Sequence, residues 1–147
     1  PTLLPGLARV LAALDRGDGT MPLLGDDDGG RLVQLDGRPP HDLRALFAQL
    51  GTALGDADLV AAARGDVAAA IWLLGPDAVP ADTAPLAPPR APRAFPDGGL
   101  WVLGAGSGPR AQHAVLDAGP HGAFNGGHAY ADALALVASA GGRPLLV

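Results

Sequence analysis

The stretch from Gly119 to Val147 reads GPHGAFNGGHAYADALALVASAGGRPLLV, and it sets the pattern expected of the C-terminal half. Its first half is rich in Gly, His and Asn, which favour loops because Gly and Asn tolerate positive φ. Its second half is apolar and predicts a strand, a Gly-Gly turn and another strand. The predicted strand closely follows His128, Tyr130 and Asp132, which would share one face of an extended chain. Because histidine can act as acid or base near neutral pH, His128 is a candidate for proton transfer.

Other apolar runs of strand length precede this stretch. Consecutive short strands with no helices between them predict an antiparallel sheet, which would form one layer of a sandwich. The strands are expected at Gly99–Leu103, Gln112–Leu116, Leu134–Ser139 and Arg143–Val147.

The N-terminal half has helical periodicity instead, with Gly-Asp pairs between its shorter segments. Helices are expected at residues 3–14, 41–54, 56–63 and 67–74. His41 or Asp42 is expected to favour the start of the second helix. Asp56 and Asp66 are expected to cap the third and fourth helices. Trp72 is expected to lie in the core.

A proline-rich stretch separates the two halves. Seven of the 15 prolines lie between Pro76 and Pro96, and proline is incompatible with the interior of a helix. The stretch therefore predicts an extended connector. We expect an α+β chain with a helical domain at residues 1–79, a linker at 80–96 and a sheet domain at 97–147.

The composition argues against several classes of partner. The net charge of −5 at pH 7 argues against nucleic acid, because phosphate binding needs a clustered basic face. No apolar run is long enough for a transmembrane helix, so no membrane partner is expected. The chain has no cysteine, which excludes disulfides and thiolate metal sites.

Two further motifs have competing interpretations. Residues 104–108, GAGSG, follow a predicted strand with the glycine spacing of a dinucleotide fingerprint, but Pro109 and a strand-like run stand where that fold needs a helix. A hairpin loop is favoured there. Residues 26–30, DDDGG, offer carboxylates that calcium prefers, but the EF-hand spacing is absent and a surface turn is favoured. His113 alternates with apolar residues, which fits a surface position or a structural residue with a satisfied ring.

The chain resembles the heparinase II/III-like polysaccharide lyases through a set of motifs in the expected order. The motifs are FPDGGL at 95–100, GPHG at 119–122, GHAYADALAL at 127–136 and GGRPLLV at 141–147, with DGT at 18–20 and LGDDDG at 24–29 upstream. The resemblance implies the C-terminal helices of an (α/α) toroid, followed by the first strands of an antiparallel β-sandwich. It also implies an anionic polysaccharide or oligosaccharide as partner and β-elimination at a uronic acid as the reaction.

The resemblance assigns roles to residues of the C-terminal stretch. His128 matches the first His of the family's His-x-His motif and is the candidate catalytic residue. His121, Asn125 and Tyr130 are candidate substrate-binding residues. Tyr130 stands where the second His helps to hold a structural zinc in some members, so no metal and no cofactor is expected.

The resemblance further implies that the chain is a fragment. It begins at Pro1 and stops within an apolar run, and the Asn-His and Tyr that the family carries in its toroid are not present. We therefore expect it to be inactive alone, as part of a bacterial lyase whose parent is periplasmic or secreted. The alternative is a non-catalytic carbohydrate-binding or structural protein on a lyase-like scaffold.

Overall fold

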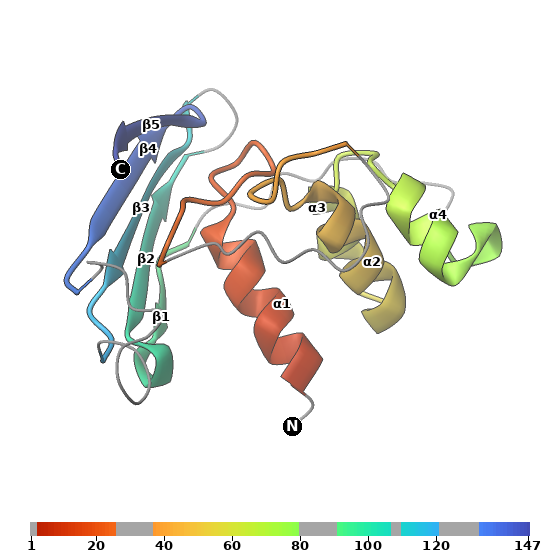
Figure 1. Ribbon diagram of the computed structural model, residues 1–147, viewed down its shortest axis with the longest axis horizontal. Coiled ribbons are helices and arrows are strands. Elements are labelled where there is room, and N and C mark those ends of the chain that lie inside the picture. The colour runs from red at the N-terminus through yellow and green to blue at the C-terminus, as the bar shows by residue number, and fades with distance from the viewer. Residues whose placement is uncertain (1–2, 26–36, 80–90, 107–109, 121–132) are drawn as a thin grey trace. The chain divides into compact units, whose positions relative to one another are not determined.

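The computed structural model describes residues 3–25, 37–79, 91–106, 110–120 and 133–147. In this part of the chain, helices are followed by a five-stranded antiparallel sheet (Figure 1), which confirms the α+β class. The chain divides into a helical unit and a sheet unit. The division is not a single cut, because Arg16–Asp18 and residues 22–25 belong to the sheet unit. No helix in the described ranges has the length and hydropathy needed to cross a bilayer.

The helical unit is built around the second of its helices. Its helices are α1 (Leu3–Leu14), α2 (Arg44–Leu54), α3 (Ala57–Ala62) and α4 (Ala68–Leu74), followed by a short 3₁₀ turn at Pro76–Ala78. Phe47 and Ala48 of α2 are fully buried, and Leu59 of α3 and Ala70 of α4 join the same core cluster. Four of the eight buried residues of this cluster are alanines, which let the helices approach one another closely.

The helix starts follow the predictions only in part. The Asp56 side chain accepts hydrogen bonds from the backbone N–H groups of Asp58 and Leu59, which confirms it as the N-cap of α3. Asp42 Oδ1 accepts a hydrogen bond from the Arg44 backbone N–H at 3.1 Å, although α2 begins three residues later than expected. The prediction for Asp66 is wrong. Val67 occupies the N-cap position of α4, and no side chain caps it.

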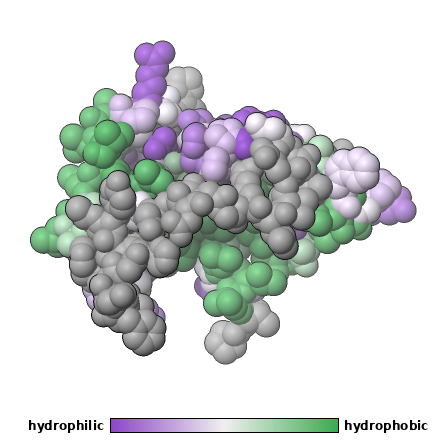
Figure 2. Space-filling view, viewed as in Figure 1, coloured by the Kyte–Doolittle hydropathy of each residue, from purple (hydrophilic) through white to green (hydrophobic). Residues whose placement is uncertain are grey.

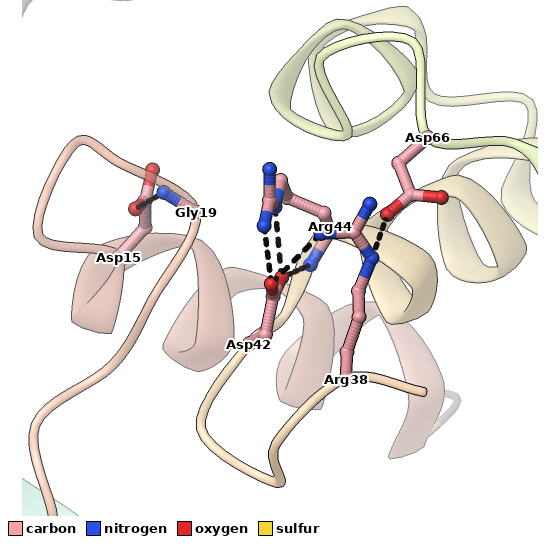
Figure 3. Close-up of polar contacts among 6 residues, drawn as sticks. All are labelled: Asp15, Gly19, Arg38, Asp42, Arg44 and Asp66. Carbon is pink, nitrogen blue, oxygen red and sulfur yellow. Dashed lines mark hydrogen bonds and ion pairs between the residues drawn. The ribbon is translucent and has the colours of Figure 1, made fainter. Parts of the chain in front are cut away.

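An ion-pair network explains why these aspartates are not simple caps (Figure 3). The Asp42 carboxylate accepts hydrogen bonds from Arg44 Nε at 2.9 Å and from Arg38 Nη1 at 3.1 Å. Arg38 Nε also lies 2.5 Å from Asp66 Oδ2, as an ion pair without hydrogen-bond geometry. Hydrogen bonding by Arg44 holds the pKa of the Asp42 carboxyl well below its ordinary range, and burial opposes this shift. Asp66 is therefore drawn to a guanidinium rather than to a helix start.

Trp72 is not a core residue of this chain. Its side chain is 77% exposed, and the neighbouring Leu73 is 59% exposed. The buried residues of α4 are Ala69 and Ala70, near its N-terminal end. The apolar composition of α4 misled the prediction, because the helix is apolar on nearly every side and periodicity cannot select its buried face.

Gly51 marks the closest approach between α2 and α3. A Cβ atom at Gly51 would lie 2.6 Å from the Val60 backbone N and 2.8 Å from Val60 Cγ2. We expect Gly51→Ala to destabilise the helical unit by about 2 kcal/mol through overpacking. Gly6 in α1 is the matched control, because a Cβ there meets nothing within 4 Å. Gly6→Ala should stabilise by about 1 kcal/mol through helix propensity. Urea unfolding followed by the helical circular dichroism signal tests both, and equal effects would contradict the close approach.

The sheet unit is a meander in which each strand pairs with the next along the chain. Its strands are β1 (Arg93–Phe95), β2 (Leu100–Ala105), β3 (Gln112–Asp117), β4 (Leu136–Ala140) and β5 (Arg143–Leu146). The spatial order is β1-β2-β3-β4-β5, and every pair is antiparallel. The predicted succession of antiparallel strands is confirmed.

β1 is the strand that the sequence did not predict. It lies within the stretch assigned to the linker, between Pro92 and Pro96. Proline is tolerated beside a sheet edge because an edge strand does not need all its N–H groups for pairing. β1 pairs only with β2 in the described part of the sheet, and Arg93 is exposed. The linker boundary at residue 96 remains a prediction, with β1 directly before it.

One face of the sheet is apolar and exposed. Trp101 pairs with Leu116, and Leu116 pairs with Leu136, so these residues project from one side of β2, β3 and β4. Trp101 is 38% exposed and Leu136 is 51% exposed. Leu103, on the same side of β2 as Trp101, is 59% exposed. Figure 2 shows apolar surface over the strands at the left of the view and along α1. The opposite side of β2 and β3 carries the buried Val102 and Val115.

Candidate functional site

The four candidate site residues belong to the connection between β3 and β4. His121, Asn125, His128 and Tyr130 lie outside the described residues, so their roles remain predictions. Both ends of the connection are described. Because β3 and β4 are neighbours in the sheet, the connection leaves and returns at the same end of the same strand pair.

The start of the connection is fixed by two hydrogen bonds, one to the turn between β1 and β2 and one to a side chain at the end of β3. The Ala118 N–H donates to the Gly99 carbonyl at 2.8 Å. The Gly119 N–H donates to Asp117 Oδ1 at 2.9 Å. Gly99 itself has φ +69° and ψ +20°, the left-handed conformation that ends the 3₁₀ turn Pro96–Gly98. The chain therefore leaves β3 in a direction set by two consecutive anchored residues.

Two glycines allow this turn and the start of the connection to pack backbone against backbone. A Cβ atom at Gly99 would lie 2.0 Å from Gly119 Cα. A Cβ atom at Gly119 would lie 2.9 Å from the Gly98 carbonyl oxygen. No side chain fits between these segments, because the nearest atom to each added Cβ is backbone and cannot rotate away. The FPDGGL and GPHG motifs thus contact one another in the fold.

The end of the connection differs from the expected strand start. Leu134 has φ +60°, which is uncommon for a non-glycine residue, and β4 begins at Leu136 rather than at Leu134. The Asp117 N–H donates to the Ala135 carbonyl at 2.9 Å, so β3 holds this end too. A turn at 133–134 precedes β4, so the strand begins two residues later than expected.

His113 is a buried structural residue. It is 5% exposed, lies on β3 and interacts with another group. Within the described ranges, no three His, Cys, Asp or Glu side chains lie close enough together to hold a metal ion. The residues of the 26–30 motif are outside the described residues, so the favoured surface turn there stays a prediction.

The glycine-rich 104–108 motif is a hairpin connection. Gly104 lies in β2, Gly106 has φ +71°, and β3 follows and pairs antiparallel with β2. A dinucleotide site needs a helix directly after the glycines, with its N-terminus facing the pyrophosphate. The chain places a strand there, so the hairpin interpretation is confirmed.

Comparison with known families identifies the segment that contains this site. Residues 87–147 match the family model described as heparinase II/III-like, C-terminal. This part of the chain matches the heparinase II/III-like family. Searches of curated proteins and of solved structures found no match. The resemblance inferred from the sequence is thereby confirmed for the segment from the proline-rich stretch onward.

The heparinase II/III-like segment includes contacts that sequence reasoning missed. The sequence placed Gly99 at the start of a predicted strand and Gly119 in a loop, and it assigned no role to Asp117. Their shared role is to hold the start of the connection that contains His128. The adjacent glycines of FPDGGL were the available signal, since paired glycines often permit a close backbone approach.

Proposed function

We propose that this chain is part of a polysaccharide lyase that cleaves uronic-acid-containing polysaccharide by β-elimination. The family match over residues 87–147 carries the proposal, because it covers the connection that contains His128. The anchored ends of that connection support it further. Functional residues often lie on loops that a rigid scaffold positions, and here hydrogen bonds to Gly99 and Ala135 anchor the two ends.

The reaction makes three demands on its site. A base takes the proton from C5 of the uronic acid, a double bond forms between C4 and C5, and the bond from C4 to the linking oxygen breaks. The leaving oxygen takes a proton from an acid, so no oxidant or reductant is needed. A group that neutralises the uronate carboxylate stabilises the charge that develops when the C5 proton departs.

We assign these demands to residues of the connection. His128 is proposed to transfer a proton or contact the uronate carboxylate, since an imidazole can hold either protonation state near neutral pH. Tyr130, Asn125 and His121 are proposed to bind the substrate through hydroxyl, amide and imidazole groups. No metal or cofactor has a part in this scheme.

The proposed architecture is the end of an (α/α) toroid followed by the start of a β-sandwich. The exposed apolar face with Trp101, Leu103 and Leu136 supports a second sheet layer, because an antiparallel sheet in a sandwich buries one face against its partner. The exposed apolar residues of α1, such as Leu3 and Leu7, similarly support packing against further helices.

We propose that the chain supplies only part of the active site. The resemblance implies an Asn-His and a Tyr from the toroid, which these 147 residues do not contain. The 147 residues alone are therefore expected to be inactive. A non-catalytic carbohydrate-binding module is the second candidate. It is favoured by Tyr130 in place of the second histidine, and by a net charge of −5, which opposes an anionic polymer.

The test uses the longest polypeptide that contains this sequence, with a panel of uronate polymers that includes alginate. Cleavage is followed by the ultraviolet absorbance of the conjugated unsaturated product. His128→Ala is expected to lower the rate by about 100-fold or more, the usual contribution of acid–base catalysis. The 147-residue chain is expected to give no product.

The exposed His41 in the helical unit provides a matched control, and His41→Ala should keep the wild-type rate. A His128→Ala protein that cleaves as fast as wild type would refute the assignment of His128. If the polypeptide binds a polymer but cleaves none, the binding-module alternative replaces the lyase.

A further inference from the structure

A small cavity in the sheet unit combines polar groups with a size that suits one water molecule. Its volume is about 10 Å³, close to the minimum for a single water. The lining residues are Arg16, Pro22, His113, Val137, Ala138, Ser139 and Leu146. All of them belong to the sheet unit, although Arg16 and Pro22 come from the segment after α1.

Among the described residues, Ser139 is the cavity residue with a buried, unsatisfied hydroxyl group. It is 5% exposed, and its Oγ makes no hydrogen bond with any residue in the described part of the chain. A buried hydroxyl without a partner loses its hydration energy and gains nothing in return. Ser139 pairs with His113 across β3 and β4, yet its hydroxyl is not bonded to that imidazole. The buried hydroxyl therefore needs another hydrogen-bonding group.

The neighbouring groups suit a water rather than an apolar ligand. A hydroxyl both donates and accepts, the His113 ring offers nitrogen atoms, and Arg16 offers guanidinium donors. A buried water usually makes about three hydrogen bonds to groups of this kind. The pairing register of β4 with β5 shifts between Ala138 and Ser139, two of the residues that line the cavity. A register shift disrupts the ladder locally, so the cavity lies where the sheet is irregular.

We propose that this cavity is a binding site for one structural water, held by Ser139 Oγ together with His113 and Arg16. The water joins the segment that follows α1 to strands β3 and β4. The site is independent of the proposed lyase chemistry, because none of its residues is part of the candidate catalytic connection.

Ser139→Ala tests the proposal by the direction in which it shifts the unfolding midpoint. If a water occupies the cavity, the substitution removes one of its partners and lowers the unfolding midpoint. If the hydroxyl is unpaired, removing it raises the unfolding midpoint or leaves it unchanged, because the substitution removes the desolvation penalty of a buried polar group. The chain has two tryptophans, one in each unit. In a Trp72→Phe background, the fluorescence of Trp101 therefore reports on the sheet unit alone.

Thr52→Val is the matched control. Thr52 Oγ1 is also buried without a hydrogen-bond partner among the described residues, and it does not line this cavity. Its midpoint, followed by the helical circular dichroism signal, should rise or stay unchanged. A crystal structure of the 147-residue chain provides the direct readout. Electron density for a water within hydrogen-bonding distance of Ser139 Oγ supports the proposal, and a dry cavity or a raised or unchanged Ser139→Ala midpoint overturns it.

Discussion

Replacing Asp42 by asparagine is expected to destabilise the helical unit by about 3 kcal/mol. The Asp42 side chain is 4% exposed and lies between the guanidinium groups of Arg38 and Arg44 (Figure 3). Asparagine keeps the shape of the side chain but removes its charge. Arg44 then loses the Asp42 carboxylate, Arg38 keeps only its ion pair with Asp66, and an amide N–H₂ group faces one of the two guanidinium groups. The effect stays at the lower end for a buried ion pair, because Arg38 and Arg44 are 34% and 29% exposed and keep part of their hydration.

The stability that Asp42 provides depends on pH in a defined direction. Its pKa is lower in the folded chain than the ordinary value of 3.8, chiefly because of hydrogen bonding by Arg44. A carboxyl with a lowered folded-state pKa stabilises the fold fully above its unfolded-state pKa. The contribution is lost as the pH falls from that value toward the folded-state pKa. The difference between wild type and Asp42→Asn should therefore be constant above about pH 5 and shrink below pH 3.8.

Urea unfolding at a series of pH values, followed by the helical circular dichroism signal, measures this difference. Asp77→Asn is the control, because Asp77 is an exposed aspartate in the same unit. Its effect should remain within about 0.5 kcal/mol, as for most surface substitutions. If Asp42→Asn is as mild as the control, or if its cost grows on acidification, the network does not stabilise the fold as argued.

The sequence predicted the elements whose periodicity is unambiguous. The helix over residues 3–14 matches α1, and each predicted strand corresponds to an observed strand with ends shifted by two residues or fewer. Alternating apolar residues and glycine-rich turns were sufficient for this, since the strands are consecutive and each turn is local. β1 was missed because flanking prolines make a short edge strand resemble a linker.

Tertiary contacts could not be read from the sequence in the same way. Asp56 and Asp66 both follow a glycine before a helix, yet one caps its helix and the other pairs with Arg38. The choice depends on whether a guanidinium lies nearby, which local sequence does not specify. The same holds for the candidate site. The sequence located His128 in a connection before a strand, but the contact of Gly99 with Gly119 joins residues that are distant along the chain.

Gly99→Ala is expected to destabilise the sheet unit by about 3 kcal/mol or more. Two effects combine. The left-handed conformation at φ +69° costs a residue with a Cβ atom roughly 1–2 kcal/mol. The new Cβ atom would also lie 2.0 Å from Gly119 Cα and 2.3 Å from Gly119 N. Since these contacts are to backbone, relief requires the turn and the start of the connection to move apart, at a cost typical of overpacking.

Gly98→Ala is a closely matched control for this substitution. Gly98 is the preceding residue in the same turn, and a Cβ atom there meets nothing within 4 Å. Its effect should remain within about 0.5 kcal/mol. Urea unfolding followed by Trp101 fluorescence, in the Trp72→Phe background, compares the two variants. Equal midpoints would contradict the close approach of Gly99 to Gly119.

In the proposed lyase, the Gly99→Ala and Gly98→Ala variants also show whether the glycine contact positions the connection that contains His128 or only stabilises the sheet unit. Displacement of Gly119 would break the hydrogen bond from the Ala118 N–H to the Gly99 carbonyl and redirect the start of the connection that contains His128. A catalytic group needs a precise position, and a small displacement can cost about 100-fold in rate. In the longer polypeptide, at a temperature where both variants are folded, Gly99→Ala should therefore lower kcat while Gly98→Ala does not. A Gly99→Ala protein that is less stable but has an unchanged kcat would show that the glycine contact supports the sheet and does not position the connection.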